Sequence, residues 1–269
     1  MCKILAYAQN RCIFIGYCCI NRQSYINAFE LERIAKNVIP CVRIGTSGYS
    51  YKWNEGRPTP FKWYVSQGFR SVEINASFYR FPTESWLKTW LTAPSGFTFS
   101  IKVHRSITHY TRLKGRSYEL WKKFRSLLSP LDNNIDFWLF QLPPDFKYNK
   151  ENLQTIQTFM QGTDLRNKAV IEFRNKSWWK QINDVEKMGV IFSSVDAPDL
   201  PNKLIAVNAG LYLRLHGSTN WYRSIYSEKE LDNLLKKIKR LNANKSAIYL
   251  NNDHGMLKNG IYLLKHLSR

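Results

Sequence analysis

Four short β-rich runs in this chain gather their polar residues at their C-terminal ends. They occupy residues 71–75, 97–104, 169–174 and 211–216. In the first run Val72 and Ile74 alternate with Glu73 and Asn75, so a strand here turns apolar side chains to one face and polar ones to the other. Parallel strands of one barrel end at the same rim, which is where barrel enzymes build their sites. The recurrence therefore predicts a parallel barrel whose mouth carries the chemistry.

Predicted strands and helices alternate from residue 42 to the C-terminus. The expected strands are 42–46, 71–75, 97–102, 137–141, 168–173, 190–195, 211–215 and 247–250. Helices are expected at 63–67, after the N-cap residue Thr83, at 118–128, 152–160, 178–188 and 228–241, and up to Leu267. This pattern predicts the α/β class and a single (β/α)8 TIM-type barrel. An open doubly wound sheet is the alternative, but the chain contains neither G-x-G-x-x-G nor G-x-x-x-x-G-K-[ST].

The first 41 residues differ in composition from the rest and hold all five cysteines. An odd count without regular spacing is no disulfide framework, and we expect a reducing cytoplasm. The apolar run 13–20 is shorter than the roughly 20 residues of a membrane helix, and no cleavage site follows it, so no membrane partner is predicted. We interpret residues 1–41 as an N-terminal extension, either an appendage or the product of a misplaced start codon, and residues 42–269 as the barrel domain.

The charge of the chain is strongly positive. Lys and Arg number 40 against 20 for Asp and Glu, which gives a formal net charge of +20. An excess of this size favours polyanionic partners such as nucleic acid. A basic protein that binds nothing charged is the alternative.

Several short motifs beyond Val42 follow one another in a recognisable order. They are GTSGY at 45–49, VEIN at 72–75 with FYR at 78–80, ITH at 107–109, QLPP at 141–144, EFR at 172–174 with SW at 177–178, RLHG at 214–217 and NND at 251–253. Together they resemble the YecE-like family, also called domain of unknown function 72, and the resemblance leaves residues 1–41 outside. It implies a TIM-type barrel and no established reaction. Similarity of that fold to metal-dependent barrel endonucleases suggests a phosphodiester substrate, on analogy of fold alone.

Strand alternation also places side chains, because one face of each barrel strand meets the helices and the other fills the interior. The residues predicted to point outward are Val72, Ile74, Ile171, Phe173, Leu211, Leu213 and Leu215. Those predicted to face the interior or its rim are Glu73, Asn75, Ser100, Lys102, Glu172, Arg174, Tyr212, Arg214 and His216. The strand-end residues Gln141, Asp196, Asn251 and Asp253 complete the mouth. Buried charges at this density must be paired or used.

Two interpretations of the mouth concern its charges alone or a metal. Glu73, Lys102, Glu172, Arg174 and Arg214 could form a neutralising salt-bridge lattice that binds no substrate. Alternatively, Glu73, Glu172, Asp196 and His216, with a histidine of the basic loop after Lys102, could hold metal ions for hydrolysis. No H-x-H or H-E-x-x-H spacing appears, and the nearby cations compete for the same carboxylates. A divalent metal is therefore the less favoured cofactor.

Two further interpretations need no metal. In one, Arg174, Arg214 and Lys102 clamp an anionic group, Glu73 or Glu172 is the general base, and His216 is an acid or base. In the other, the rim binds single-stranded nucleic acid without chemistry, because aromatic residues and cations interleave in the predicted loops. The aromatic residues are Tyr49, Tyr51, Trp53, Phe78, Tyr79, Phe81, Trp178, Trp179, Trp221 and Tyr222.

We therefore predict an enzyme that acts on a phosphate-containing substrate, either a small molecule or nucleic acid, at the C-terminal mouth of the barrel. The predicted catalytic residues are Glu73, Glu172, Asp196 and His216. The predicted substrate-binding residues are Asn75, Tyr79, Arg80, Lys102, His109, Gln141, Arg174, Trp178, Arg214, Asn251 and Asp253. The alternative is a nucleic-acid-binding protein with a basic, aromatic rim and a catalytically silent mouth.

Overall fold

The computed structural model describes residues 41–207, 210–241, 243 and 245–267. The predicted N-terminal extension lies outside the described residues except for Cys41, which begins the first strand. The interpretation of that segment as an appendage or a start-site product therefore stays a prediction.

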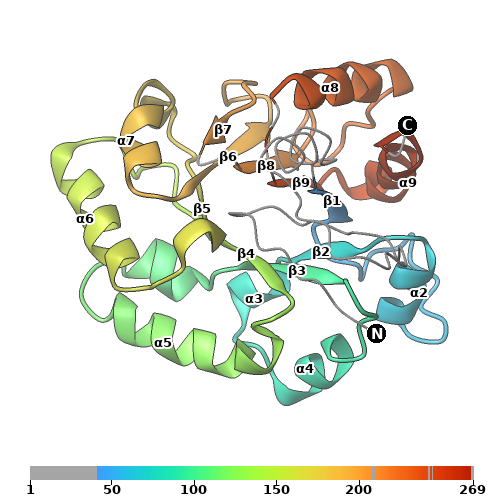
Figure 1. Ribbon diagram of the computed structural model, residues 1–269, viewed down its shortest axis with the longest axis horizontal. Coiled ribbons are helices and arrows are strands. Elements are labelled where there is room, and N and C mark those ends of the chain that lie inside the picture. The colour runs from blue at the N-terminus through green and yellow to red at the C-terminus, as the bar shows by residue number, and fades with distance from the viewer. Residues whose placement is uncertain (1–40, 208–209, 242, 244, 268–269) are drawn as a thin grey trace, which may run out of the picture.

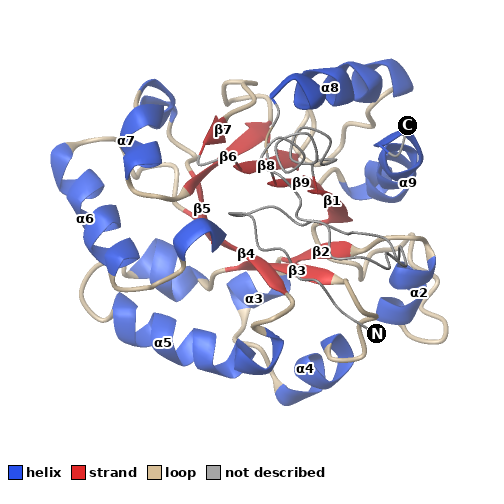
Figure 2. Ribbon diagram, in the orientation of Figure 1, coloured by secondary structure: helices blue, strands red, loops and turns tan. Residues whose placement is uncertain are grey.

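Eight parallel strands form an almost closed barrel with helices around its outside (Figures 1 and 2). Their order is β1-β9-β8-β6-β5-β4-β3-β2, and a short strand, β7, pairs antiparallel with β8. The predicted barrel is confirmed, and each predicted strand is present. The strands are β1 (Cys41–Thr46), β2 (Ser71–Ile74), β3 (Thr98–Lys102), β4 (Ile135–Gln141), β5 (Ala169–Glu172), β6 (Ile191–Asp196), β7 (Ala206–Val207), β8 (Gly210–Leu215) and β9 (Lys245–Leu250).

The barrel closes between β1 and β2, where hydrogen bonds to one side chain take the place of main-chain pairing. No main-chain pairing joins these two strands within the described residues. Instead, the buried Tyr64 hydroxyl accepts a hydrogen bond from the Thr46 amide at 3.1 Å and donates one to the Ser71 carbonyl at 2.7 Å. The strands lie so close that a Cβ on Gly45 would be 2.4 Å from the Ser71 oxygen, which explains the glycine. We call this contact the seam.

The buried apolar side chains form two clusters, one on the outer face of the sheet and one inside the barrel. The large outer cluster contains helix residues together with all seven side chains predicted to point outward, so that prediction is confirmed. The small inner cluster consists of strand residues only, namely Phe137, Leu139, Val170, Ile191, Tyr212, Ala247 and Tyr249. Large rings fill the barrel, which is a packed core and not a channel.

The helical layer follows the prediction except in the loops beside the mouth. Its α-helices are α2 (Pro60–Ser66), α3 (Ala76–Tyr79), α4 (Glu84–Trp90), α5 (Ser117–Leu128), α6 (Lys150–Gln161), α7 (Ile182–Lys187), α8 (Glu228–Leu241) and α9 (Met256–Leu267). Short turns complete the layer: a π-helix η1 (Ser106–Tyr110) and the 3₁₀ turns η2 (Ser129–Leu131), η3 (Arg166–Lys168), η4 (Lys176–Lys180) and η5 (Asp253–Gly255).

Several of these elements differ from the sequence prediction. The helix predicted at 178–188 is divided into the 3₁₀ turn η4 and the six-residue helix α7. Thr83 caps α4 as predicted, because its hydroxyl accepts from the Trp86 amide. However, α3 and η1 occupy segments that the sequence indicated as loops. Both are single turns, too short to show a helical repeat.

No helix within the described ranges is long and apolar enough to cross a bilayer. The expected cytoplasmic location stays a prediction.

Candidate functional site

The centre of the barrel mouth is an arginine held between two carboxylates. Arg214 comes from β8, Glu73 from β2 and Glu172 from β5, and all three residues are fully buried. Nε of Arg214 donates to Glu73 Oε2 at 2.9 Å and its Nη2 donates to Oε1 at 2.7 Å, while Nη1 donates to Glu172 Oε2 at 2.7 Å. Strand alternation turns these side chains inward, so the sequence placed this triad correctly.

Glu73 has no free acceptor position facing solvent. Besides the two contacts from Arg214, it accepts the Tyr212 hydroxyl at 2.6 Å and the Ser47 hydroxyl at 3.0 Å. Tyr212 in turn lies 2.5 Å from the Ser100 hydroxyl inside the barrel. A carboxylate with this many donors is held firmly in place, and no face of it is open to a substrate.

Glu172 is similarly engaged. Its second oxygen accepts from Nε of Arg174. Burial alone would raise the pKa of Glu172, but Arg174 and Arg214 outweigh burial and the pKa is lowered. The same triad raises the pKa of Arg214, because Glu172 and Glu73 outweigh the desolvation of the guanidinium. Both groups are charged over the whole physiological range.

Arg174 connects this buried triad to the rim. Its side chain is 10% exposed, and its Cζ lies 4.7 Å from the centre of the Trp221 ring. Its Nη2 is 3.4 Å from Nε2 of His216. Its Nε donates to Glu172, and we call the Nη side of the guanidinium its outer edge.

His216 is buried and uncharged. Burial, followed by the charges of Arg214 and Arg174, lowers its pKa well below the usual value. Its Nδ1 lies 3.0 Å from the Asn251 side-chain amide. Nδ2 of Asn251 is the atom that faces Nδ1 and it can only donate, so Nδ1 accepts, the proton of the neutral ring is on Nε2, and Arg174 is in contact with His216 without donating to it.

Lys102 ends β3 beside the triad but has no carboxylate of its own. It is 7% exposed, and no Asp or Glu of the described residues lies within 4.0 Å of its Nζ. Its Nζ instead lies 4.1 Å from the centre of the Phe78 ring. Burial, followed by the charge of Arg214, lowers the pKa of Lys102 to about 7, and Glu172 and Glu73 oppose this only in part.

His109 also contacts the Phe78 ring. The two rings meet edge to face with centroids 4.9 Å apart, and Nδ1 of His109 is 2.9 Å from the Thr108 hydroxyl. Burial, then the nearby charges of Lys102 and Arg112, lower the pKa of His109 to about 4. The imidazole is therefore neutral at physiological pH.

The side chains of two predicted site residues are engaged elsewhere, although the Asp196 carbonyl accepts from the His216 amide at 2.9 Å. The Asp196 carboxylate, at the end of β6, accepts from Asn202, Ser218 and Tyr226, and so fastens the loop after β8. Trp178 is fully buried, its indole N–H donates to the Phe146 carbonyl at 2.8 Å, and its ring stacks on the Phe173 ring. In this structure Trp178 offers no surface to a ligand.

The remaining predicted site residues are half-buried or exposed. Asn75 and Gln141 are half-buried at the ends of β2 and β4, and Asp253 is half-buried in η5 with a φ of 41°. Asn75 Oδ1 is 3.5 Å from Nη2 of Arg214. Tyr79 is exposed, and Arg80, also exposed, lies over the Trp86 ring at 5.9 Å.

The described part of the chain contains no group of three or more His, Cys, Asp and Glu side chains arranged to hold a metal ion. Glu73, Glu172 and His216 do converge, but the guanidiniums of Arg214 and Arg174 lie between and against them. The donor set at the mouth therefore suits an anion better than a cation.

One contributor to the site was not singled out from the sequence, and another was predicted only as an aromatic residue of the rim. The first is Ser47, which donates to Glu73, and the second is Tyr51, whose hydroxyl donates to the Ser47 carbonyl at 2.8 Å. Burial and the nearby Asp253 and Glu73 raise the pKa of Tyr51 to about 12. Ser47 belongs to the GTSGY segment and Tyr51 lies two residues beyond it, and that motif was the available signal.

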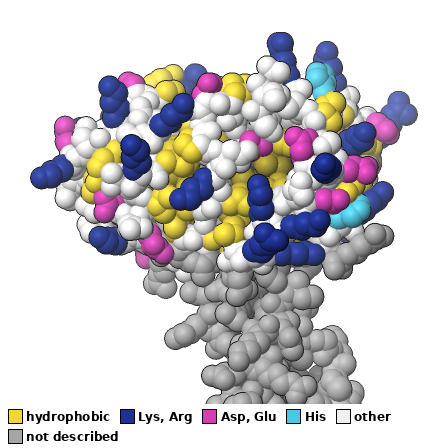
Figure 3. All heavy atoms as spheres, turned by 90° about the horizontal axis from the view of Figure 1, so that it is seen from above, with side chains coloured by type: hydrophobic (Ala, Val, Ile, Leu, Met, Phe, Trp, Pro, Cys, Tyr) yellow, Lys and Arg dark blue, Asp and Glu magenta, His cyan; other side chains and the backbone are white. Residues whose placement is uncertain are grey.

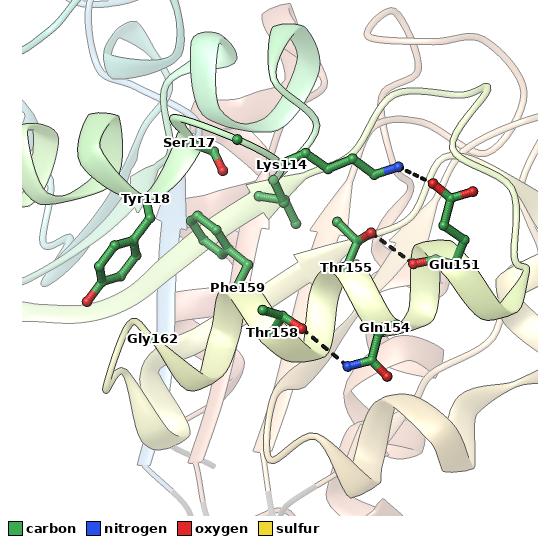
Figure 4. Close-up of a pocket in the computed structure, with 11 residues that line it drawn as sticks. Lys114, Ser117, Tyr118, Glu151, Gln154, Thr155, Thr158, Phe159 and Gly162 are labelled. Carbon is green, nitrogen blue, oxygen red and sulfur yellow. Dashed lines mark hydrogen bonds and ion pairs between the residues drawn. The ribbon is translucent and has the colours of Figure 1, made fainter.

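The hollows outlined on the helical layer lie away from the mouth. One of about 610 Å³ lies between α5 and α6, where Lys114 pairs with Glu151 over Tyr118 and Phe159 (Figure 4). Another of about 460 Å³ lies near the C-terminus of α6 and the start of β6. Neither is lined by a residue of the charged group.

Comparison with known proteins gives a family and a fold. A family model described as "Protein of unknown function DUF72" matches residues 43–268. No curated protein matches the chain.

The solved structures that it resembles include members of the same family. A DUF72 family protein from Thermotoga maritima is 24% identical, with a TM-score of 0.73 over 85% of this chain and 100% of that one. A DUF72 family protein from Enterococcus faecalis is 21% identical, with a TM-score of 0.72 over 86% of this chain and 98% of that one. At these identities the likeness shows the fold alone.

Proposed function

The chain belongs to the DUF72 family, and from that premise and the geometry of the mouth we propose that it is an enzyme acting on a phosphate-containing substrate at the C-terminal end of its barrel. The observation that carries the proposal is an excess of cationic groups. The carboxylates of Glu73 and Glu172 are both taken by guanidiniums, whereas Lys102 has no carboxylate within 4.0 Å in the described structure. An anion bound beside Lys102 and the outer edge of Arg174 would supply the missing negative charge.

The proton chemistry falls to groups that are near neutral and reachable. Glu73 and Glu172 were predicted as bases, but each already accepts at both oxygens. In our proposal they are positioning residues that hold Arg214 and Arg174. Lys102 is the proton acceptor because its pKa of about 7 leaves much of the amine free at physiological pH. His216 orients Arg174 and Asn251 around the substrate.

Phosphate binding tests this proposal directly. We expect saturable binding of inorganic phosphate by calorimetry, weakened at least about tenfold by Lys102→Met, since one buried charge contact with phosphate is lost. Lys88→Met is the matched control, because Lys88 lies on the outer helix α4 and is 73% exposed at its side chain. Absence of saturable binding, or equal weakening in both variants, would refute an anion site at the mouth.

A second candidate function has its own observation. Arg105 lies between two exposed tyrosines, 5.8 Å from the Tyr79 ring and 5.6 Å from the Tyr110 ring. Exposed aromatic rings beside a guanidinium suit the stacking of nucleic-acid bases. On the face drawn in Figure 3, however, Lys and Arg are spread among acidic and hydrophobic side chains.

Salt dependence separates this candidate from the enzyme. A nucleic-acid-binding rim should bind a single-stranded oligonucleotide with an affinity that falls steeply with salt, and Tyr79→Ala with Tyr110→Ala should weaken it. If those changes leave oligonucleotide binding intact, the rim is not the binding surface.

A further inference from the structure

Lys102 has the surroundings of a nucleophile as well as those of a base. Its backbone is fixed, because its carbonyl accepts from the Ser77 hydroxyl at 2.6 Å and it ends β3, which pairs with β2 on one side and with β4 on the other. The side chain runs along the Phe78 ring, which limits where Nζ can go. Its 7% exposure leaves a narrow access from the mouth.

The charges around Lys102 favour a free amine. The charges of Arg214 and Arg174 oppose a third positive charge, while Glu172 and Glu73, which would favour it, are bound to those same guanidiniums. His109, which also contacts Phe78, is neutral. Desolvation of an amine, or another cation near it, activates lysine for attack on carbonyl carbon.

We infer that Lys102 forms a covalent imine with an aldehyde or ketone substrate whose phosphate or carboxylate group is held by Arg174 beside it. This inference rests on the proposed function only for the placement of the anionic group. The burial of Lys102 at the strand end, its missing carboxylate partner and the two neighbouring guanidiniums carry the rest.

The covalent step balances without any additional reactant beyond a proton from solvent. The Nζ lone pair attacks the carbonyl carbon, the C=O π electrons move to oxygen, and that oxygen takes a proton while nitrogen loses one, giving a carbinolamine. The hydroxyl then takes a second proton, from solvent, the C–O bond breaks, oxygen leaves as water, and the nitrogen lone pair forms the C=N bond of a protonated imine. The protonated imine draws electrons from the adjacent carbon, so the reactions that it serves are proton transfer or carbon–carbon cleavage next to a carbonyl.

Reductive trapping tests the inference on the full-length protein. With cyanoborohydride and dihydroxyacetone phosphate or pyruvate, we expect one added mass, mapped to the peptide that carries Lys102. At pH 7 a group with a pKa of about 7 has on the order of a thousandfold more free amine than a lysine with the ordinary value of 10.5. Labelling of Lys102 should therefore exceed that of the exposed Lys88 at least about tenfold, since burial and lower basicity offset part of the advantage.

Variants and competitors distinguish the two proposals. Lys102→Arg keeps a cation and should still bind phosphate but should not be labelled, and inorganic phosphate should protect the wild-type protein. Labelling that spreads over exposed lysines, or persists in Lys102→Arg, overturns the imine. If phosphate binds and Lys102 is not labelled, the imine fails and the anion site stands. If Lys102 is labelled equally by dihydroxyacetone phosphate and uncharged dihydroxyacetone, the anion site fails instead.

Discussion

The two ends of the barrel hold inverse charge clusters. At the C-terminal end Arg214 lies between Glu73 and Glu172, with both partners of each ion pair fully buried. At the N-terminal end a carboxylate lies between two cations: Asp136 accepts from Lys245 at 2.8 Å and from Arg43 at 3.3 Å. There the side chains are between 18% and 32% exposed.

The cluster at the N-terminal end, formed by Asp136, Arg43 and Lys245, is called the lower cluster here. It arises from a β-bulge between β3 and β4. The pairing of β3 with β4 shifts so that Phe99 faces Ile135 and Ser100 faces Phe137, which leaves Asp136 as a bulged residue. Bulging lets Asp136 join Arg43 and Lys245 without disturbing the alternation that follows. Burial alone would raise the pKa of Asp136, but Lys245 and then Arg43 lower it.

The two clusters contain similar ion pairs but differ in how deeply those pairs are buried. Partly exposed charges keep much of their hydration, so the lower cluster costs little and contributes little. Fully buried charges lose their hydration, and an apolar replacement of the whole set is often no less stable. A charged set at the mouth therefore adds little net stability over an apolar set of similar volume.

The largest effect is expected when the cluster at the C-terminal end, the upper cluster of Arg214, Glu73 and Glu172, is broken. Arg214→Met leaves two carboxylates buried without a partner, and we expect a loss of about 3–5 kcal/mol in the free energy of unfolding. Urea unfolding followed by tryptophan fluorescence measures it. Since the variant could fail to fold, Glu73→Gln added to Arg214→Met is the companion, and it should recover part of the loss. A loss below about 1 kcal/mol would mean that the buried pairing matters no more than a surface pair.

The next test concerns Lys102, which has no carboxylate partner in the upper cluster. The folded pKa of Lys102 is about 7, below the unfolded value of 10.5, so the unfolded chain binds more protons between these pH values. The penalty is therefore full below about pH 7 and disappears as pH rises to 10.5. Lys102→Met should raise the free energy of unfolding at pH 6 by a few kcal/mol and change it little at pH 10.5. A pH-independent effect would show that Lys102 is an ordinary lysine.

The smallest effect is expected at the lower cluster. Asp136→Asn should cost about 1 kcal/mol at pH 7, because partly exposed pairs are weak. Its folded pKa lies below 3.8, so the contribution is present above that value and is lost as pH falls through the folded pKa. Thermal unfolding at low and high salt should show the wild-type advantage shrinking with salt. An effect as large as that of Arg214→Met would erase the difference between the two ends.

The strand framework and the inner face of the barrel were predictable from the sequence. Alternation placed Glu73, Glu172 and Arg214 on one face, and parallel strands brought them to one rim. The bulge at Asp136 was missed because the predicted strand began only at Phe137. No local pattern marks a residue whose partners come from β1 and β9.

The loops around the mouth were less predictable for a related reason. Trp178 and Tyr79 both follow strands and carry large aromatic rings, yet one is fully buried and the other is 63% exposed. The difference depends on Phe146 and Phe173, which pack on Trp178 from separate segments. The same holds for Asp196, whose donors come from two loops that the sequence does not connect to it.

The seam has a mechanical consequence for the charged mouth. Thr46 is fastened across the seam through Tyr64, and the next residue, Ser47, donates to Glu73. Any sliding of β1 along β2 would stretch both contacts at once. A displacement of β1 relative to β2 would therefore move Ser47 relative to Glu73, and so change the electrostatic potential at Arg214.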